Sequence, residues 1–171
     1  SSGTRSYANR RRAWISTLYS PGETLKHDTQ VNNPYTRGMA AYISGLRYED
    51  IPAGVRERLK LLILDSLGCG LYAAKLEWSL MLMDGLCAVD TSTGCGVWGT
   101  QRRLSGPHAA LVNGTLIQGF EIDDVFHRGP IHVGAVTLPA LFAVVEGKPN
   151  MSGRDLLTAA LAGYEIGPRA A

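Results

Sequence analysis

From Gly38 onward, hydrophobic residues recur with a helical period, which predicts a chain built almost entirely of helices. In the first run, Met39, Tyr42, Ile43 and Leu46 are spaced i, i+3, i+4 and i+7 and form one apolar stripe. No pair of strand-like segments joined by turn chemistry follows anywhere, and no internal repeat is present. The pattern therefore predicts an all-α fold.

The second helical run begins near Asp50, which is placed to cap it, with Pro52 tolerated in its first turn. We expect its inner face to consist of Val55, Leu59, Leu62, Ile63, Ser66, Leu67 and Gly70. The second half, LILDSLGCGLYAA, is apolar on nearly every side. We therefore expect that half to be buried, with Gly68 and Gly70 allowing another helix to approach closely.

Four more helices are predicted, over about 79–89, 107–120, 135–146 and from Ser152 onward. Ser152 and Asp155 form a capping-box pattern, and Pro139 lies in a first turn or marks a kink. Between the first two, residues 91–96 are rich in turn formers, and Val97 and Trp98 read as a short extended piece. Arg102 and Arg103 then form a basic turn that either meets an anionic ligand or is only solvated, and Ser105 is placed to cap the next helix.

Composition narrows the functional classes. A formal net charge of +2 over 171 residues does not favour a nucleic-acid partner, and no apolar run is long enough to cross a bilayer. Cys69, Cys87 and Cys95 are odd in number and lack metal-site spacing, so we expect free thiols in a reducing compartment.

The first 37 residues differ from the rest and are expected to form a separate arm, with a partial helical domain over 38–171. The segment RSYANRRRAWISTLYS contains several arginines and no acidic residue, which is typical of a mitochondrial transit peptide and equally compatible with a solvated, disordered arm. We therefore expect a cytoplasmic or mitochondrial protein. Because the sequence starts at Ser1 without Met and stops directly after GYEIGPRAA, we also expect it to be a fragment of something longer.

The candidate chemistry lies between Gly119 and Pro139, where three carboxylates and two imidazoles fall within twelve positions: Glu121, Asp123, Asp124, His127 and His132. If the preceding helix continued, Glu121 and Asp124 would share one face, and the turn at Gly129-Pro130 would bring His132 back toward them. A carboxylate beside an imidazole holds the ring in one tautomer and favours its protonated form. Such a pair suits proton transfer at a carbon next to a carboxylate.

Three other interpretations remain open from spacing alone. A metal site is one, although the spacing matches no known ligand motif. A nucleophilic triad is another, although no Gly-x-Ser-x-Gly elbow is present. The third is purely structural, with the acids capping and hydrogen-bonding the loop and both histidines serving only as their partners.

Four ordered blocks of the sequence resemble the N-terminal part of the MmgE/PrpD family, which includes 2-methylcitrate dehydratases and cis-aconitate decarboxylases. They are LLILDSLGCGLYAA, VWGTQRRLSGPHAALVNGTLIQGFEIDD, HVGAVTLPALFAVVE and SGRDLLTAALAGYEIGPR. The resemblance covers about Gly38 to Arg169. It implies the N-terminal part of a helical domain, with the smaller α+β lid domain absent from this chain. It also implies a homodimer in the full-length form, no metal or organic cofactor, and a small di- or tricarboxylic acid as substrate.

By this resemblance, His132 matches the family's acid/base histidine, and Asp123 and Asp124 match the last two acids of its D-x-D-D motif. Glu121 stands where many members carry the first Asp. Val125 replaces the Thr that often follows, which removes a hydroxyl able to bind a substrate carboxylate. The family's chains are more than twice as long, and the other histidine, the lysines and the lid that complete the pocket would come after Ala171.

These observations predict a fragment of a cofactor-independent lyase. His132 is expected to be the general acid/base, with Asp123 and Asp124 as its catalytic partners, and with Glu121 and His127 contacting substrate or supporting the loop. Glu121 together with the Pro-Ile-His turn favours the decarboxylase branch over the dehydratases. The alternative is a truncated, non-catalytic helical interaction module, and we expect the isolated piece to be inactive.

Overall fold

The computed structural model describes residues 33–148 and 150–170, so the predicted targeting segment lies outside the described residues. The elements are α2 (Pro34–Ser44), a 3-10 helix (Tyr48–Asp50), α3 (Ala53–Ala73), α4 (Glu77–Cys87), β1 (Cys95–Gly96), β2 (Arg103–Leu104), α5 (Gly106–Gln118), α6 (Val133–Glu146) and α7 (Gly153–Ala170). The two strands form one short antiparallel pair, which corrects the expectation that no strands pair. All the other elements are helices, so the predicted all-α class is confirmed. The chain divides into two compact units, residues 1–56 and 57–171.

In the first unit, α2 begins earlier than the apolar stripe predicted. Asn33 caps the helix because its side-chain oxygen accepts the N–H groups of Tyr35 (3.0 Å) and Thr36 (3.3 Å). The first helical turn therefore includes residues assigned to the arm, while the domain division at residue 37 stays a prediction.

The prediction that Asp50 caps the long helix is wrong. Asp50 ends the 3-10 helix, and its N–H donates to the carbonyl of Arg47. Helix α3 starts three residues later, where the carbonyl of Pro52 accepts the N–H of Arg56. Pro52 thus stands just before the helix, a position where its missing N–H costs nothing.

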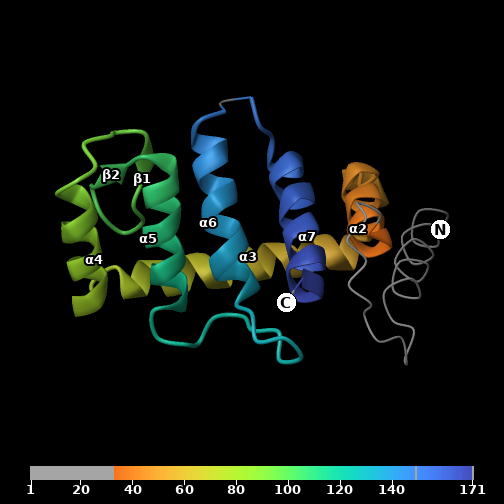
Figure 1. Cartoon of the computed structure of the whole chain (residues 1–171), viewed down its shortest axis with the longest axis horizontal. Helices are drawn as coiled ribbons and strands as arrows, with labels where there is room; N and C mark the ends of the chain where they lie inside the picture. Colours follow the sequence, from red (N-terminus) through yellow and green to blue (C-terminus); the bar gives the residue numbers. More distant parts are fainter. Residues whose placement is uncertain (1–32, 149, 171) are drawn as a thin grey trace. The chain divides into compact units, whose positions relative to one another are not determined.

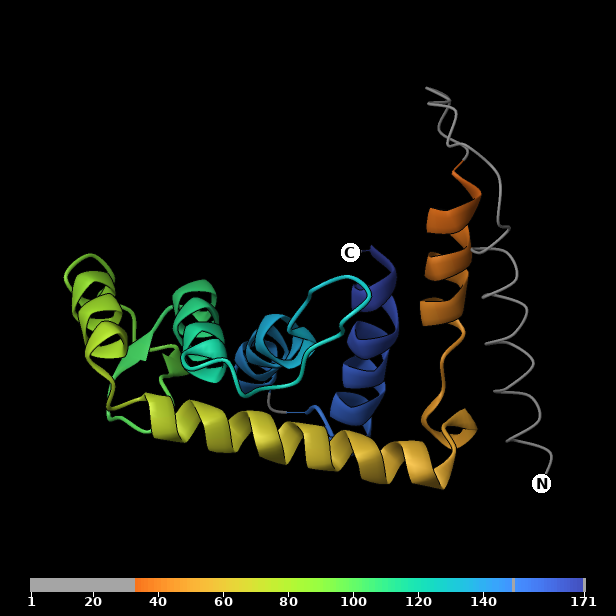
Figure 2. The same cartoon turned by 90° about the horizontal axis from the view of Figure 1, so that it is seen from below.

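In the second unit, α4, α5, α6 and α7 lie side by side in chain order along one side of α3 (Figures 1 and 2). Helix α5 makes its most extensive contacts with α6, and α6 packs in turn on α7. The main cluster of buried hydrophobic residues lies among α4, the two strands and α5, and it contains fully buried Met83, Leu104, Val112 and Leu116. Burial of such side chains is the main stabilising contribution to a helical unit of this size.

The second half of α3 is not buried all round, which corrects the prediction. Leu64 is 66% exposed and Leu71 is 53% exposed, because the described neighbours of this half of the helix lie on one side of it. Gly70 is buried, and a Cβ there would lie 3.0 Å from the Trp98 ring and 3.8 Å from Ile117 of α5, so a helix does approach at this position. Nothing lies within 4 Å of the position that a Cβ on Gly68 would take. Leu59, Ser66 and Gly70 are buried as predicted.

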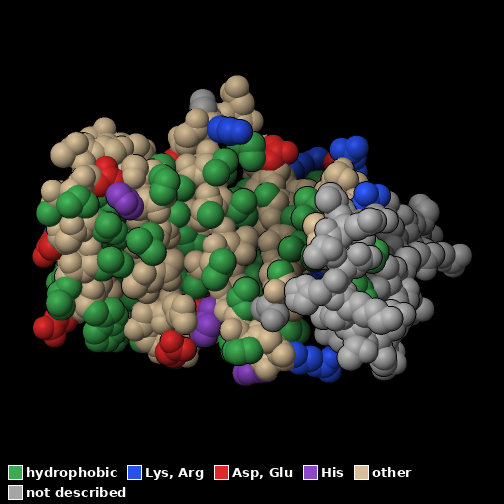
Figure 3. All heavy atoms as spheres, in the orientation of Figure 1, with side chains coloured by type: hydrophobic (Ala, Val, Ile, Leu, Met, Phe, Trp, Pro, Cys, Tyr) green, Lys and Arg blue, Asp and Glu red, His purple; other side chains and the backbone are tan. Residues whose placement is uncertain are grey.

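Close approach of helices also occurs between α5 and α6. A Cβ on Gly114 would lie 2.8 Å from the carbonyl oxygen of Ala135. Pro139, which lies inside α6, has no N–H to give that carbonyl, so the neighbouring helix comes near at the place where the hydrogen-bond ladder is interrupted. Hydrophobic side chains remain exposed over α5 and α6, as the face in Figure 3 shows, and they include Leu111 and Val136.

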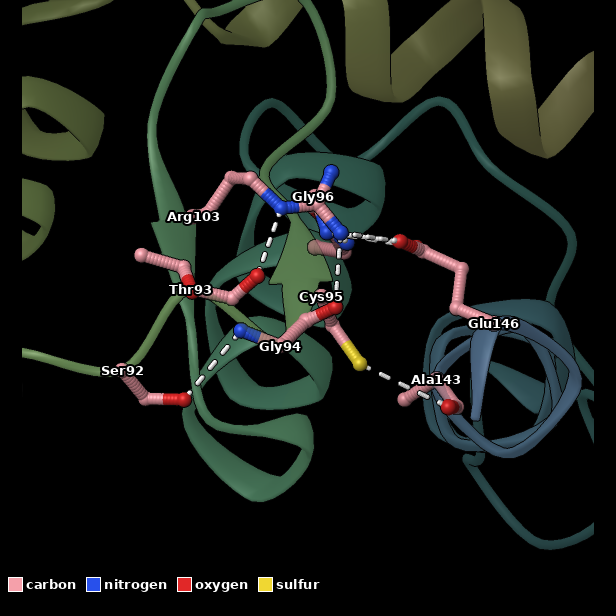
Figure 4. A network of polar contacts seen from close by, with 9 residues as sticks. Ser92, Thr93, Gly94, Cys95, Gly96, Arg103, Ala143 and Glu146 are labelled. Carbon is pink, nitrogen blue, oxygen red and sulfur yellow. Dashed lines mark hydrogen bonds and ion pairs between the residues drawn. The ribbon is translucent and has the colours of Figure 1, made fainter. Parts of the chain in front are cut away.

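The two arginines of the basic turn are both paired, which leaves neither simply solvated. Arg102 forms an ion pair with Asp84 at 2.6 Å. The Arg103 guanidinium donates to the carbonyls of Thr93 (2.7 Å) and Gly94 (2.6 Å) and pairs with Glu146 (3.2 Å) (Figure 4). Arg103 therefore ties the loop before β1 to the C-terminal end of α6.

Several local predictions hold. Ser152 and Asp155 form the predicted capping box, with the Asp155 N–H donating to Ser152 Oγ (3.2 Å) and the Ser152 N–H to Asp155 Oδ2 (2.9 Å). All three cysteines are free, and Cys69 and Cys95 are buried. Ser105 precedes α5 as predicted, although its hydroxyl bonds Asp90 rather than the helix. Over the part of the chain that is described, every helix is too short or too polar to cross a membrane.

Candidate functional site

The candidate site is built on the loop that joins α5 to α6. Helix α5 ends at Gln118, so the predicted helical continuation through the acidic residues is wrong. Glu121 adopts a φ of 62°, a left-handed conformation that ends any helix. The predicted turn at Gly129-Pro130 is present, and it is closed by an N–H of Phe126 that donates to the carbonyl of Ile131 (3.0 Å).

This turn returns the chain so that His132 becomes the N-cap residue of α6, close to the acids that precede it. Its Nδ1 lies 3.0 Å from Asp123 Oδ1. Its Nε2 lies 3.5 Å from Glu121 Oε2, which is an ion-pair separation rather than a hydrogen bond. The imidazole thus stands between Asp123 and Glu121. The spacing predicted Glu121 and Asp124 as its neighbours, but the loop brings Asp123 to the ring in place of Asp124.

The two carboxylates meet the ring in different surroundings. The Asp123 side chain is fully buried, whereas that of Glu121 is 69% exposed. Burial raises the pKa of Asp123, and the adjacent His132 opposes that rise. When Asp123 is ionised it accepts the Nδ1–H of the ring, which leaves Nε2 on the more exposed side to exchange protons.

Asp124 holds the backbone of α6 and, among the hydrogen bonds of the described residues, forms none with the imidazole. Its oxygens accept the N–H of Gly134 at 3.2 and 3.3 Å, and Oδ1 also accepts the hydroxyl of Tyr164 at 3.1 Å. Burial raises the pKa of Asp124, and the hydrogen bond from Tyr164 counteracts the rise. The adjacent acids therefore do different things, since Asp123 contacts the ring and Asp124 contacts the helix that follows it.

The remaining predicted residue, His127, is not brought into this group. It is exposed on the turn, and it makes no hydrogen bond or ion pair with any other residue of the described ranges. Val125, which replaces a frequent Thr, is also exposed, at 38%.

Tyr164 and Ser66 were not identified as site residues from the sequence. Tyr164 lies 40 positions beyond Asp124, and its only signal was its place on the apolar face of α7. Ser66 is fully buried on α3 and faces the same point, since a Cβ on Gly134 would lie 2.6 Å from its Oγ. A hydroxyl on an otherwise apolar helix face was the signal that could have drawn attention to it.

A second histidine–carboxylate pair lies elsewhere in the unit and was also missed. His108 Nδ1 lies 2.6 Å from Asp90 Oδ2, which also accepts the hydroxyl (2.6 Å) and the N–H (2.9 Å) of Ser105. These groups stand at the N-terminus of α5, where a carboxylate is favoured by the helix dipole. The serine and the histidine bond the same oxygen rather than each other, so this is a contact centred on the Asp90 carboxylate and not a nucleophilic triad.

A cavity of about 320 Å³ borders the acidic loop. It is lined by Arg58, Leu61, Leu62 and Asp65 of α3 and by Ile122, Asp123 and Asp124 of the loop. Arg58 is the one basic residue among these, and the carboxylates beside it make the cavity a poor site for an anion by itself. Within residues 33–148 and 150–170, no cluster of three or more His, Cys, Asp or Glu side chains is arranged to hold a metal ion.

Comparison with known proteins relates this chain to carboxylic-acid lyases. Over 148 residues it is 36% identical to a cis-aconitate decarboxylase-like protein, oryM, of Aspergillus oryzae, covering 83% of this chain and 31% of that protein. It is 35% identical to cis-aconitate decarboxylase of Aspergillus terreus over 147 residues, with 83% and 30% coverage. The mouse cis-aconitate decarboxylase is 35% identical over 135 residues, which cover 77% of this chain and 28% of that enzyme.

The chain thus spans less than a third of the length of these relatives. A sequence model of the family described as the MmgE/PrpD N-terminal domain matches residues 37–171, which is most of the chain. The chain therefore belongs to the MmgE/PrpD family and corresponds to its N-terminal domain.

Proposed function

We propose that this chain is the N-terminal part of a cofactor-independent lyase that acts on a small di- or tricarboxylic acid, with His132 as its general acid/base. The observation that carries the proposal is the contact between His132 Nδ1 and buried Asp123, which leaves Nε2 beside Glu121. A decarboxylation breaks one carbon–carbon bond, releases CO2 and leaves an electron pair on the adjacent carbon. Protonated His132 supplies the proton that this carbon takes up.

The residues around His132 have distinct roles in this proposal. Asp123 fixes the ring and stabilises its positive charge, while Asp124 fixes the start of α6. Glu121 orients the exposed side of the imidazole or contacts substrate. His127 contacts substrate from the exposed turn.

A decarboxylase of cis-aconitate is favoured over a 2-methylcitrate dehydratase. The relatives above are named as cis-aconitate decarboxylases or as decarboxylase-like, and Glu121 with the Pro-Ile-His turn favoured the same branch. The partners proposed for the full-length form are a small carboxylic acid and a second copy of the chain. Its proposed compartment is the cytoplasm or the mitochondrion.

The test is turnover by the natural polypeptide that carries this chain, at the length it has in its source. We expect CO2 release from cis-aconitate, followed by headspace analysis, and no loss of water from 2-methylcitrate. His132→Gln replaces the imidazole by a polar amide that cannot transfer the proton. We therefore expect kcat to fall by roughly 100- to 10,000-fold.

His108→Gln is the matched control, because His108 also bonds a carboxylate through Nδ1 but lies at the N-terminus of α5. We expect it to retain turnover. Turnover of neither acid would contradict the lyase proposal, and an active His132→Gln variant would contradict the role given to His132.

A non-catalytic helical interaction module is the second candidate, and exposed apolar residues of α3 favour it. Leu61, Leu64 and Leu71 are 57%, 66% and 53% exposed, which is unusual for one helix of a soluble unit. If this were the function, the natural protein would bind through this face and turn over no acid. Sedimentation velocity over a range of concentrations, run beside the turnover assay, separates the two.

A further inference from the structure

We propose that Tyr164, acting through Asp124, is a positioning residue that sets the direction of the His132 imidazole by fixing the backbone at the start of α6. The inference rests on the function proposed for His132 and extends it to a residue on α7. It assigns Asp124 a role different from that of its neighbour Asp123.

The first step is the location of His132 on the backbone. As the N-cap of α6, it lies where the chain turns from the loop into the helix, so its side chain points in a direction set by how α6 begins. Two residues later, the Gly134 N–H is one of the donors that the first turn of a helix leaves without an intrahelical partner. Both Asp124 oxygens accept it, at 3.2 and 3.3 Å.

The second step is the hydroxyl that holds Asp124. Tyr164 comes from α7, forty positions along the chain, and donates to Asp124 Oδ1 at 3.1 Å. Burial, together with the nearby Asp124 carboxylate, raises the pKa of Tyr164, so the phenol keeps its proton and remains a donor near neutral pH. A carboxylate held from two sides cannot turn about its side-chain torsions to release Gly134.

The third step is the lack of space around this contact. A Cβ on Gly134 would lie 2.8 Å from the Tyr164 hydroxyl and 2.6 Å from Ser66 Oγ, and it would overlap Asp124 Oδ1. Groups from α3, the loop and α7 therefore meet the α6 backbone at one point. Because interiors packed this closely transmit displacements, loss of the Tyr164 hydroxyl shifts the start of α6 and the imidazole with it.

Tyr164→Phe tests this directly, because it removes the hydroxyl and keeps the ring. In the natural polypeptide we expect kcat to fall by roughly 10-fold while KM stays within about twofold, since a misplaced proton donor affects the chemical step rather than binding. Tyr72→Phe is the matched control, because the Tyr72 side chain is exposed and its ring contact with Phe120 survives the change. We expect the control to behave as the unaltered protein.

A second readout does not depend on turnover. The ring 15N shifts of His132, assigned by NMR, report its tautomer and the strength of the bond to Asp123. We expect Tyr164→Phe to move these shifts toward a mixture of tautomers and to leave those of His108 in place. Tyr72→Phe should leave both sets unchanged.

The two readouts separate the inference from the proposed function. Shifted His132 signals in a protein that turns over neither acid would support positioning and contradict the lyase proposal. Normal turnover and unchanged His132 signals in Tyr164→Phe would overturn the inference.

Asp124→Asn, which retains the shape of the side chain and one acceptor oxygen, provides a second variant should Tyr164→Phe fold poorly. Because both residues act through one contact, we expect it to move the His132 signals in the same direction, and the double variant to add little to either single change. His132 signals that do not move in Asp124→Asn, or fully additive effects in the double variant, would also contradict the inference.

Discussion

Glu121 is the one described residue other than glycine with a positive φ, at 62°, and it lies directly after the end of α5. A side chain with a Cβ pays roughly 1–2 kcal/mol for this conformation. Its carboxylate stands 3.5 Å from His132 Nε2. An unfavourable backbone conformation is therefore present beside the candidate site. Such strain is commonly retained at functional sites.

Replacing Glu121 by Gly and by Ala separates the strain from the carboxylate. Both changes remove the charge near His132, but only Gly removes the Cβ. Even after the greater unfolded-state entropy of Gly, we expect Glu121→Gly to be about 0.5–1 kcal/mol more stable than Glu121→Ala. Urea unfolding measures the difference, and a Glu121→Ala variant of equal or greater stability would mean that the position carries no strain.

The lowered pKa of Asp90 predicts that folding stability changes with pH in the direction opposite to that set by Asp123 and Asp124. The hydroxyl of Ser105 and the N–H groups of Ser92 and Ser105 hold the pKa of Asp90 well below its usual value. A lowered folded-state pKa adds stability that is fully present above the unfolded value of about 3.9. That stability declines as the pH falls below this value and is fully lost only below the lowered folded-state pKa. Asp123 and Asp124, whose pKa values are raised by burial, have the opposite sign and add stability at low pH.

We therefore expect Asp90→Asn to lower the thermal unfolding midpoint at pH 7 and to lower it by a smaller amount at pH 3, where the folded-state carboxylate is still ionised. Unfolding followed by circular dichroism from pH 3 to 7 measures this. Asp155, which is exposed and whose pKa is lowered by Ser152, is the control, and Asp155→Asn should show a change of the same sign. An equal loss from Asp90→Asn at both pH values would show that the charge of the carboxylate is not what matters.

At the scale of elements, the approach of α5 to α6 depends on Gly114. A methyl group there would lie 2.8 Å from the backbone oxygen of Ala135, and a backbone atom cannot move aside as a side chain can. Gly68 is also inside a helix, but nothing lies within 4 Å of the corresponding position. The two glycines thus form a matched pair with different surroundings.

We expect Gly114→Ala to destabilise the protein by about 1–3 kcal/mol through overpacking. Gly68→Ala should stabilise it by up to about 1 kcal/mol, because alanine is the better helix former. Chemical unfolding of the two variants measures both values. Equal effects at the two positions would show that α5 and α6 are not in the close contact described above.

Local signals predicted the elements well, whereas contacts between distant residues could not be predicted. The capping box at Ser152 depends on residues three positions apart and is confirmed. The continuation of α5 into the acids failed because the sequence does not reveal that Glu121 leaves the helical region. The proximity of His132 to Asp123 could be predicted, since a Gly-Pro turn reverses the chain between them. The contact of Tyr164 with Asp124 could not, because forty residues separate the two.

At the scale of the whole molecule, the hydrophobic composition of α3 predicted burial on all sides, but the helices of the described part of the chain lie along one side of its second half. When nearly every position of a helix is hydrophobic, the sequence pattern does not indicate which face is covered by neighbours. Leu64 and Leu71 are seven residues apart and therefore lie on one face, with Gly68 between them. An exposed seam of this spacing favours association of the chain at high concentration.

The double variant Leu64→Glu with Leu71→Glu tests whether this face is accessible in solution. Neither leucine is buried, so we expect the free energy of unfolding to change by less than about 1 kcal/mol, while like charges suppress association. Leu116→Glu is the contrasting variant, because Leu116 is fully buried and a charge there should prevent folding. Sedimentation velocity on this 171-residue chain gives the readout, with a smaller sedimentation coefficient expected for the double variant at high concentration. A double variant that unfolds as Leu116→Glu does would mean that the seam is covered in solution.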